Sequence, residues 1–390
     1  MTCRSDHWVL DLMAFRSQNS SMSYRFFAII AIHLSIITAH AERMENESVV
    51  FCSDLQPRAA QLLFKPDKIE SVSRADGSKT FKEGVDYRID SNGRITLTDN
   101  SSIPVLTYYG KAIEKGTYGF ADMKGRPFYS PGGTMKHKDY DIVVTYSYSQ
   151  GSLDQMMQGA WHPGLTTALE KLKAKNPLNL TFFGDSITFG AQASSLAPGC
   201  HPFAPAYPMQ VINSLKSTYG YSEIQYANPS VGGKTSAWGL EQINQVVSTK
   251  PDLVVLAFGM NDSSGKVPTQ TYTSNIESMM KALRAANPDV SIILVAEFSP
   301  NPEWPAANYP LRAKNRDALE GLHKKYKNTA FVDVGMVSRR IAEKKKFQDI
   351  SGNNLNHPND FLNAIYADLV LKVLEGKRIP VSVGKAPNKP

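Results

Sequence analysis

The 390-residue sequence has only three cysteines, and no cysteine or histidine pair occurs at the spacing of a metal site. It has no repeats at the periods of about 20 to 50 residues typical of solenoids and propellers. Positive charge is not gathered into blocks: the net charge of +7 is spread along the chain, and we expect the triplet Lys344–Lys346 to lie on a solvated helix face. Nucleic acid is therefore not an expected partner.

Long apolar runs are also scarce, and the longest lies near the N-terminus. Arg25 precedes the apolar run Phe26–Thr38, and the small-residue pattern Ala39–Ala41 follows it. A membrane-spanning helix needs about 20 apolar residues, so this run predicts a signal peptide over residues 1–41, cleaved after Ala41. An uncleaved anchor is the alternative. We expect a secreted or periplasmic protein without stable membrane insertion.

The remaining composition indicates a globular protein. Hydrophobic residues make up 42% and charged residues 20% of the chain, which excludes a disordered chain, a collagen-like fibre and a small disulfide scaffold. The length favours two domains. Cys3 leaves with the predicted signal, and Cys52 and Cys200 either form a disulfide or remain free thiols.

Residues 42–150 predict a small β-sandwich. Asn92 and Gly93 separate two short runs as the turn of a two-residue hairpin would, and the stretch between Gly110 and Lys138 has no assignment. The runs with a β-like pattern are Lys68–Ser73, Val85–Ile89, Arg94–Leu97 and Asp141–Tyr148.

After a linker at about 150–164, apolar runs alternate with helical periodicity. This alternation predicts a second domain over residues 165–378, with a parallel sheet covered by helices on both faces. The tail 379–390 is expected to be disordered. The strand candidates are Leu180–Phe183, Ile224–Ala227, Leu253–Phe258, Ile292–Ala296 and Phe331–Val334.

Four polar motifs follow the expected strands or precede the last helix. They are Phe183–Thr188, Asn228–Thr235, Gly259–Asp262 and Asn354–Asp360. The first places a serine at a strand-to-helix turn, although Gly-Asp-Ser alone is also typical of a helix N-cap. Because active groups gather at the carboxyl ends of parallel strands, we expect the motifs to meet at one edge of the sheet.

Together the motifs supply what acyl transfer needs. Ser186 offers a hydroxyl nucleophile and His357 an imidazole that takes its proton. The N–H groups of Ser186 and Gly233 and the amide of Asn261 offer donors for an oxyanion. An imidazole in an ordinary environment would lose its base function below about pH 6.5.

Over Leu178–Leu374 these motifs, in this order, resemble the SGNH hydrolases, or GDSL lipase/acylhydrolase superfamily. The resemblance implies a flavodoxin-like three-layer α/β/α domain and a serine ester hydrolase without metal or cofactor. It makes Ser186 the nucleophile and His357 the general base. It also makes Ser186, Gly233 and Asn261 the oxyanion hole.

One position departs from that family pattern. The family usually has aspartate three residues before the histidine, where this chain has Asn354. Asparagine in place of such an aspartate costs about 10⁴ in rate in a serine protease. Asn354 either orients the ring through its carbonyl oxygen or is neutral scaffolding beside a Ser–His dyad, and we adopt the second as a hypothesis.

The predicted function is hydrolysis of short-chain esters, with acetyl groups on carbohydrate as the leading substrate. The chain is similar to two-domain carbohydrate acetylesterases with an N-terminal β-sandwich, which supports this choice. The alternatives are a lipase or general acylhydrolase, an O-acyltransferase, and a carbohydrate-binding module with weak esterase activity. The sequence leaves the oligomeric state open.

Overall fold

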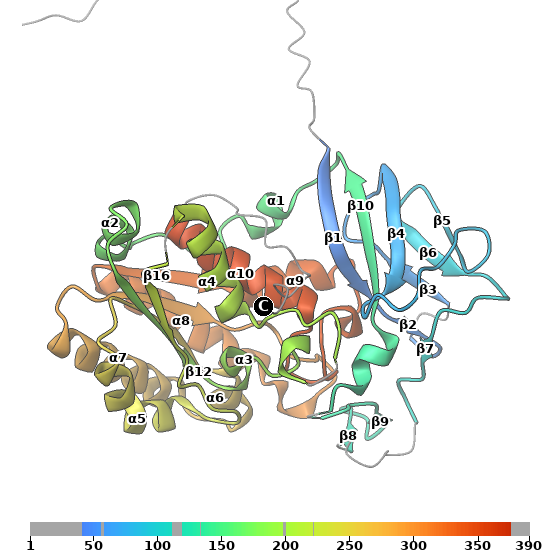
Figure 1. Ribbon diagram of the computed structural model, residues 1–390. Helices are drawn as coiled ribbons and strands as arrows, with labels where there is room; N and C mark the ends of the chain where they lie inside the picture. Colours follow the sequence, from blue (N-terminus) through green and yellow to red (C-terminus); the bar gives the residue numbers. More distant parts are fainter. Residues whose placement is uncertain are drawn as a thin grey trace, which may run out of the picture. The chain divides into compact units, whose positions relative to one another are not determined.

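The computed structural model describes residues 41–55, 58–110, 119–132, 134–197, 200–220 and 222–375 (Figure 1). The chain divides into the units Met1–Ala39 and His40–Pro390, and every described residue belongs to the second unit. Residues 1–40 of the predicted signal peptide and the predicted tail 379–390 lie outside the described residues. Within the described ranges, no helix combines the length and the apolar character that crossing a membrane requires.

The second half of the chain forms the predicted parallel sheet, because each of the expected runs becomes a strand, and all of these strands except the edge strand over Ile224–Ala227 are mostly buried. The parallel strands lie in the order β13-β12-β14-β15-β16, which is the flavodoxin-like order. The predicted fold class is therefore confirmed. The strands are β12 (Leu178–Gly184), β13 (Ile224–Ala227), β14 (Leu253–Ala257), β15 (Ser291–Ala296) and β16 (Thr329–Asp333).

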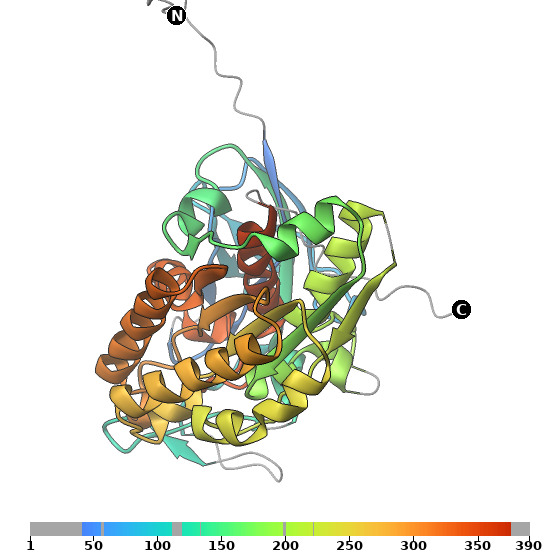
Figure 2. The same cartoon turned by 90° about the vertical axis from the view of Figure 1, so that its left-hand side faces the viewer.

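Helices cover both faces of this sheet, as Figures 1 and 2 show. One face packs against α5, α7 and α8, and the other against α2, α4, α9 and α10. α10 is buried along almost its whole length, because it packs against the sheet, α4 and β1. The helices are α2 (Thr167–Lys173), α4 (Tyr207–Tyr219), α5 (Ser236–Ser248), α7 (Thr269–Ala286), α8 (Tyr309–Lys325), α9 (Val334–Ala342) and α10 (Asp360–Glu375).

A β-rich region precedes the parallel sheet. One antiparallel sheet has the order β1-β10-β4 and a second has the order β3-β6-β5. A parallel pair, β2-β7, and an antiparallel pair, β8-β9, complete it. The strands are β1 (Glu42–Val49), β2 (Phe51–Cys52), β3 (Ala59–Gln61), β4 (Lys68–Arg74), β5 (Tyr87–Ile89), β6 (Arg94–Leu97), β7 (Val105–Leu106), β8 (Phe120–Ala121), β9 (Pro127–Phe128) and β10 (Ile142–Tyr148).

The loop between β5 and β6 differs from the expected two-residue hairpin. It spans four residues, Asp90–Gly93, with Gly93 at a φ of 80°. The Asp90 carboxylate accepts hydrogen bonds from the N–H groups of Asn92 and Arg94, at 2.8 and 3.0 Å. These side-chain bonds stabilise the longer turn.

Short elements occupy stretches that the sequence left unassigned or read as linker. In the expected linker, β11 (Trp161–His162) pairs antiparallel with β16 and so extends the parallel sheet. The 3₁₀ helix η1 (Lys136–Tyr140) lies at the end of the unassigned stretch of the β-rich region. The others are α1 (Leu153–Met157), α3 (Ser186–Phe189), α6 (Met260–Ser264), η2 (Ser194–Leu196), η3 (Pro305–Ala307) and η4 (Phe347–Asp349).

The β-rich region and the parallel sheet share apolar and polar contacts. Apolar side chains of β1, β4, β6 and β10 fall in the same buried cluster as those of β12, α4 and α10. A buried ion pair joins Glu47 of β1 to Lys345, 2.5 Å apart, with both side chains fully buried. The expectation that Lys345 lies on a solvated helix face is therefore wrong, because Lys345 follows the end of α9 and pairs with a buried carboxylate. Cys52 is a buried free thiol and Cys200 a half-buried one.

Candidate active site

Ser186 lies at the carboxyl end of β12, in a turn that leaves no room for larger residues. A Cβ on Gly184 would approach the Ala257 carbonyl oxygen to 2.2 Å, so only glycine fits there. Asp185 caps α3 by accepting a hydrogen bond from the Ile187 N–H at 2.9 Å. Ser186 follows as the first residue of α3, and its N–H has no acceptor within that helix.

His357 contacts Ser186 directly. It belongs to the loop Ser351–Asp360, called here the histidine loop, which precedes and begins α10. The Nε2 of His357 lies 2.9 Å from the Ser186 Oγ. Burial lowers the pKa of His357 from 6.5 to about 4, because a charged ring is poorly solvated there. The ring is therefore neutral at physiological pH and can accept a proton.

A second asparagine, Asn353, contacts the His357 ring at Nδ1, the nitrogen that does not face Ser186. Its Oδ1 accepts the backbone N–H groups of Leu355, Asn356 and His357, each at 3.0 Å. Three converging donors fix which end of the amide is oxygen. The Nδ2 therefore faces the His357 Nδ1 at 3.0 Å. In this arrangement Nδ1 accepts a hydrogen bond and Nε2 carries the ring proton.

The side chain of Asn354, the orienter considered from the sequence, points to the β-rich region and not to the His357 ring. Its backbone has a φ of 57°, a left-handed conformation that asparagine tolerates better than most residues. Its Nδ2 donates to the Tyr129 carbonyl at 3.0 Å, and its Oδ1 faces the His137 Nε2 at 3.1 Å. An ionised aspartate here could not donate to the Tyr129 carbonyl.

The sequence analysis missed Asn353. The available signal was the adjacent pair Asn353–Asn354, in which either side chain has the reach to contact His357. Spacing counted from the histidine selected the second residue of the pair. The left-handed backbone at Asn354 and the turn held by the Asn353 oxygen instead direct the first residue to the ring.

The three predicted oxyanion donors lie on neighbouring turns. Asn261 donates to the Asp185 Oδ2 and to the Lys234 carbonyl, both at 3.0 Å, which ties three of the motifs together. Gly233 is exposed at a φ of 75°, and a Cβ built there would meet no atom within 4 Å. A Cβ on neighbouring Gly232 would lie 3.6 Å from that of Ser186. The second motif thus approaches the nucleophile with open space beside it.

Two buried carboxylic acids, Asp185 and Glu297, contact the turn that carries Asn261. Burial raises the pKa of Asp185 to about 7, and burial together with Asp185 raises the pKa of Glu297 well above its usual value. The two carboxyl groups lie close enough for each to act on the pKa of the other. Glu297 also accepts the Met260 N–H at 2.6 Å, beside Asn261. Asp185 is thus the buried acceptor that orients the Asn261 amide.

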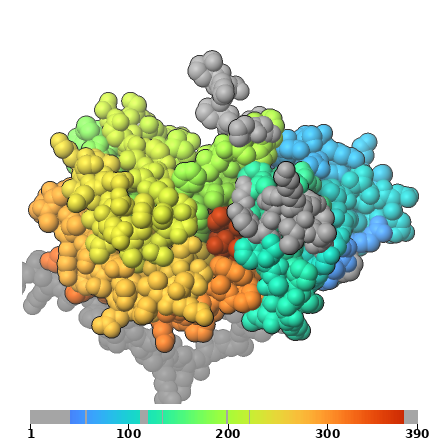
Figure 3. Space-filling view, turned by 90° about the horizontal axis from the view of Figure 1, so that it is seen from below, coloured from blue at the N-terminus to red at the C-terminus, as the bar shows by residue number. Residues whose placement is uncertain are grey.

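The surface near the dyad combines polar loops with a few apolar side chains. Phe189 is 51% exposed and Val231 40% exposed, on the turns that follow β12 and β13. Figure 3 shows C-terminal chain, coloured red, in a hollow between the yellow and green α/β part and the teal β-rich part. Among the residues that the structure describes, no three His, Cys, Asp or Glu side chains are grouped to hold a metal ion.

Comparison with known proteins locates a family match on this half of the chain. Residues 182–365 match the model of the GDSL-like lipase/acylhydrolase family. Among solved structures, a two-domain esterase active on acetylated mannans, co-crystallised with mannopentaose, is similar. Its identity is 24%, over 58% of this chain and 58% of that chain, with a TM-score of 0.44.

A catalytic mutant of an acetylxylan esterase from Geobacillus stearothermophilus is also similar. Its identity is 20%, over 51% of this chain and 94% of that chain, with a TM-score of 0.44. The chain therefore matches somewhat over half the length of the two-domain esterase and most of the acetylxylan esterase. No curated protein matches the chain.

Proposed function

We propose that Ser186 and His357 hydrolyse carboxylic esters, starting from the match of residues 182–365 to the GDSL-like lipase/acylhydrolase family. The observation that carries the proposal is the 2.9 Å contact between the Ser186 Oγ and the His357 Nε2. A serine hydroxyl is a weak nucleophile unless a neutral base lies within hydrogen-bond distance. Burial of His357 keeps that base neutral.

The proposed reaction has two steps. The Ser186 Oγ attacks the ester carbonyl carbon while its proton passes to the His357 Nε2, and the tetrahedral intermediate expels the alcohol, which takes that proton. Water then attacks the acyl-enzyme with His357 again as the base, releasing the carboxylic acid and restoring Ser186. We assign the stabilisation of both oxyanions to the N–H groups of Ser186 and Gly233 and to the Asn261 amide, which must release either Asp185 or the Lys234 carbonyl to donate.

The proposed base must carry its resting proton on Nδ1, so that Nε2 is free to accept. Asn353 opposes this tautomer, because its amide nitrogen faces Nδ1. The dyad therefore works from a disfavoured tautomer, and we expect slower turnover than in a Ser–His–Asp triad. This feature distinguishes the site from the usual family pattern more than the loss of aspartate at position 354 does.

For the substrate, we propose short acyl groups, with acetyl esters of carbohydrate as the leading class. The choice of an acetyl group rests on the resemblance to acetylesterases stated from the sequence. The carbohydrate part rests on the similarity to two-domain carbohydrate acetylesterases noted from the sequence. Export to the periplasm or the medium remains part of the proposal.

A general acylhydrolase acting on longer chains is the second candidate. Exposed Phe189 and Val231 favour it, since both lie on turns next to the nucleophile. Initial rates on p-nitrophenyl acetate, p-nitrophenyl octanoate and an acetylated oligosaccharide, with Ser186→Ala as the control, separate the two candidates. Preference for acetyl supports the first, and preference for octanoate supports the second. Equal activity of Ser186→Ala and wild type would contradict both.

A further inference from the structure

His137 lies in the β-rich region, yet it contacts the histidine loop. It belongs to η1 and is 1% exposed. Its Nδ1 lies 2.9 Å from the Asp141 Oδ1, and its Nε2 lies 3.1 Å from the Asn354 Oδ1. A buried side chain 217 residues away in sequence thus contacts the loop that carries the catalytic base.

The two contacts of His137 determine its protonation. Because the Asn354 Nδ2 donates to the Tyr129 carbonyl, the amide cannot be reversed, and its oxygen faces His137. The partner of Nδ1 is a carboxylate oxygen, which also accepts. Each ring nitrogen of His137 therefore faces an acceptor, the arrangement that suits an imidazolium ion.

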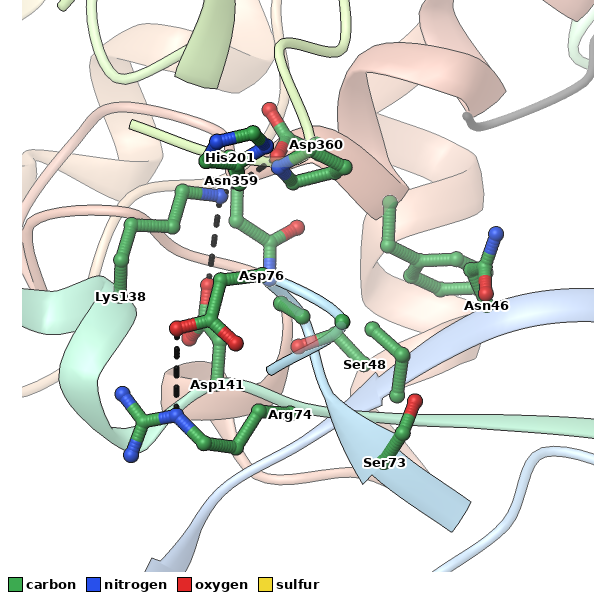
Figure 4. A pocket seen from close by; sticks show the side chains of 15 residues that line it. Asn46, Ser48, Ser73, Arg74, Asp76, Lys138, Asp141, His201, Asn359 and Asp360 are labelled. Carbon is green, nitrogen blue, oxygen red and sulfur yellow. Dashed lines mark hydrogen bonds and ion pairs between the residues drawn. The ribbon is translucent and has the colours of Figure 1, made fainter. Parts of the chain in front are cut away.

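The surroundings of His137 supply the compensating negative charge. Burial by itself raises the pKa of Asp141, but Lys138 and His137 together lower it below its usual value. Lys138 lies 3.3 Å from Asp141 and 2.7 Å from Asp360, so two carboxylates face two cations. Figure 4 shows Lys138, Asp141 and Asp360 at the wall of a cavity of about 430 Å³, which Arg74, Asp76 and His201 also line.

The histidine loop is held by the β-rich region at consecutive residues. The Ser130 hydroxyl donates to the Asn353 carbonyl at 2.7 Å, and His137 and Tyr129 hold both ends of the Asn354 amide. Asn353 in turn organises the N–H groups up to His357. Displacing Asn354 therefore moves the residues that aim the His357 ring at Ser186.

We propose that His137, as an imidazolium ion paired with Asp141, is a positioning residue that acts on His357 through Asn354. The inference rests on the proposed function, because it assigns His357 the role of base. It gives the β-rich region a part in catalysis that does not depend on binding substrate.

Two near-isosteric variants of the full chain test the link. The Gln amide nitrogen is placed like Nε2 and keeps the donor to Asn354, whereas the Asn amide nitrogen is placed like Nδ1 and keeps only the donor to Asp141. We expect His137→Asn to lower kcat on p-nitrophenyl acetate by about 10- to 100-fold, with little change in KM. His137→Gln should stay within about threefold of wild type, since the Asn354 contact survives.

The control is His323→Ala. His323 bonds the Thr329 carbonyl on β16, away from the histidine loop, and we expect wild-type kcat from this variant. Equal kcat values for His137→Gln and His137→Asn would overturn the proposal. Circular dichroism melting of each variant shows whether it is folded under the assay conditions.

A readout independent of activity completes the test. In ¹⁵N-histidine NMR, His137 should show both ring nitrogens protonated at neutral pH, and the His357 ring signals should shift in His137→Asn but not in His137→Gln. A neutral His137 ring, or unchanged His357 signals in both variants, would contradict the proposal. If the wild type hydrolyses no ester, the proposed function fails, and the NMR experiment still decides the link between His137 and His357.

Discussion

The amide nitrogen of Asn353 lies 3.0 Å from the Nδ1 of His357, while the Nε2 of the same ring lies 2.9 Å from the Ser186 Oγ. A donor thus occupies the place where a triad has an acceptor. The other described features of the dyad fit the proposed reaction, since burial keeps the His357 ring neutral. We therefore expect the identity of residue 353 to influence the rate of the proposed reaction.

Asn353→Asp should raise kcat by at least about tenfold. One carboxylate oxygen keeps the three backbone N–H bonds, and the other accepts the Nδ1 proton, which favours the productive tautomer. The expected gain is part of the 10⁴ that the aspartate contributes in a serine protease. Steady-state kinetics on p-nitrophenyl acetate measure it.

Asn354→Asp is the matched control for this gain. Its carboxylate would face the Tyr129 carbonyl, so we expect a less stable protein and no increase in kcat. An equal gain from both substitutions, or a loss from Asn353→Asp in a folded protein, would contradict the role given to Asn353.

The pH profile should reflect the buried histidine. Since the base acts in its neutral form and burial lowers its pKa to about 4, kcat/KM should stay high as the pH falls through 6.5 and decline with a midpoint near pH 4. Initial rates from pH 3.5 to 7, with circular dichroism at each pH to exclude unfolding, give the profile. A midpoint near 6.5 would mean that the ring is solvated during turnover.

Asn261→Ala should lower kcat by about 10²- to 10³-fold, the usual cost of removing one oxyanion donor. The substitution also leaves the Asp185 Oδ2 and the Lys234 carbonyl without their donor. Asn287→Ala removes an amide that donates to the Pro251 carbonyl and accepts the Asp289 N–H, outside the four motifs, and serves as the control. Similar kcat values for the two variants would remove Asn261 from the oxyanion hole.

The ion pair between Glu47 and Lys345 should make the β-rich region necessary for stability. Lys345→Met leaves the Glu47 carboxylate buried without its cation, and we expect the free energy of unfolding to fall by about 3–5 kcal/mol. Urea denaturation measures the change. Lys325→Met, which removes an exposed partner of Glu277, should change it little. Equal effects would show that burial of the pair is unimportant.

The sequence predicted the parts of this fold that depend on local pattern. Buried strands such as Leu253–Ala257 are continuous apolar runs, and the buried face of α7 follows from residues at three-to-four spacing. The placement of Ser186 at the end of β12 follows equally, because parallel strands end at one edge of the sheet. The four-residue loop after β5 was not predicted, because it depends on hydrogen bonds that the Asp90 carboxylate accepts from the backbone of the loop.

The rest of the site depends on contacts between distant segments and on single backbone angles. No spacing rule indicates that the left-handed turn at Asn354 directs Asn353 to the ring. His137 reads as an ordinary polar residue in an unassigned stretch, and only the fold places it against the histidine loop. The pKa of His357 likewise depends on burial, which a motif does not contain.

The most direct test of the account is to trap the acyl-enzyme. Wild type and Ser186→Ala are mixed with p-nitrophenyl acetate, quenched in acid during turnover, digested and examined by mass spectrometry. We predict one acetyl group on the peptide that contains Ser186 in the wild type, and none in the variant, which should also be inactive. Rapid hydrolysis by the wild type with no acetyl group on that peptide, or full activity of Ser186→Ala, would contradict the central claim that Ser186 is the nucleophile.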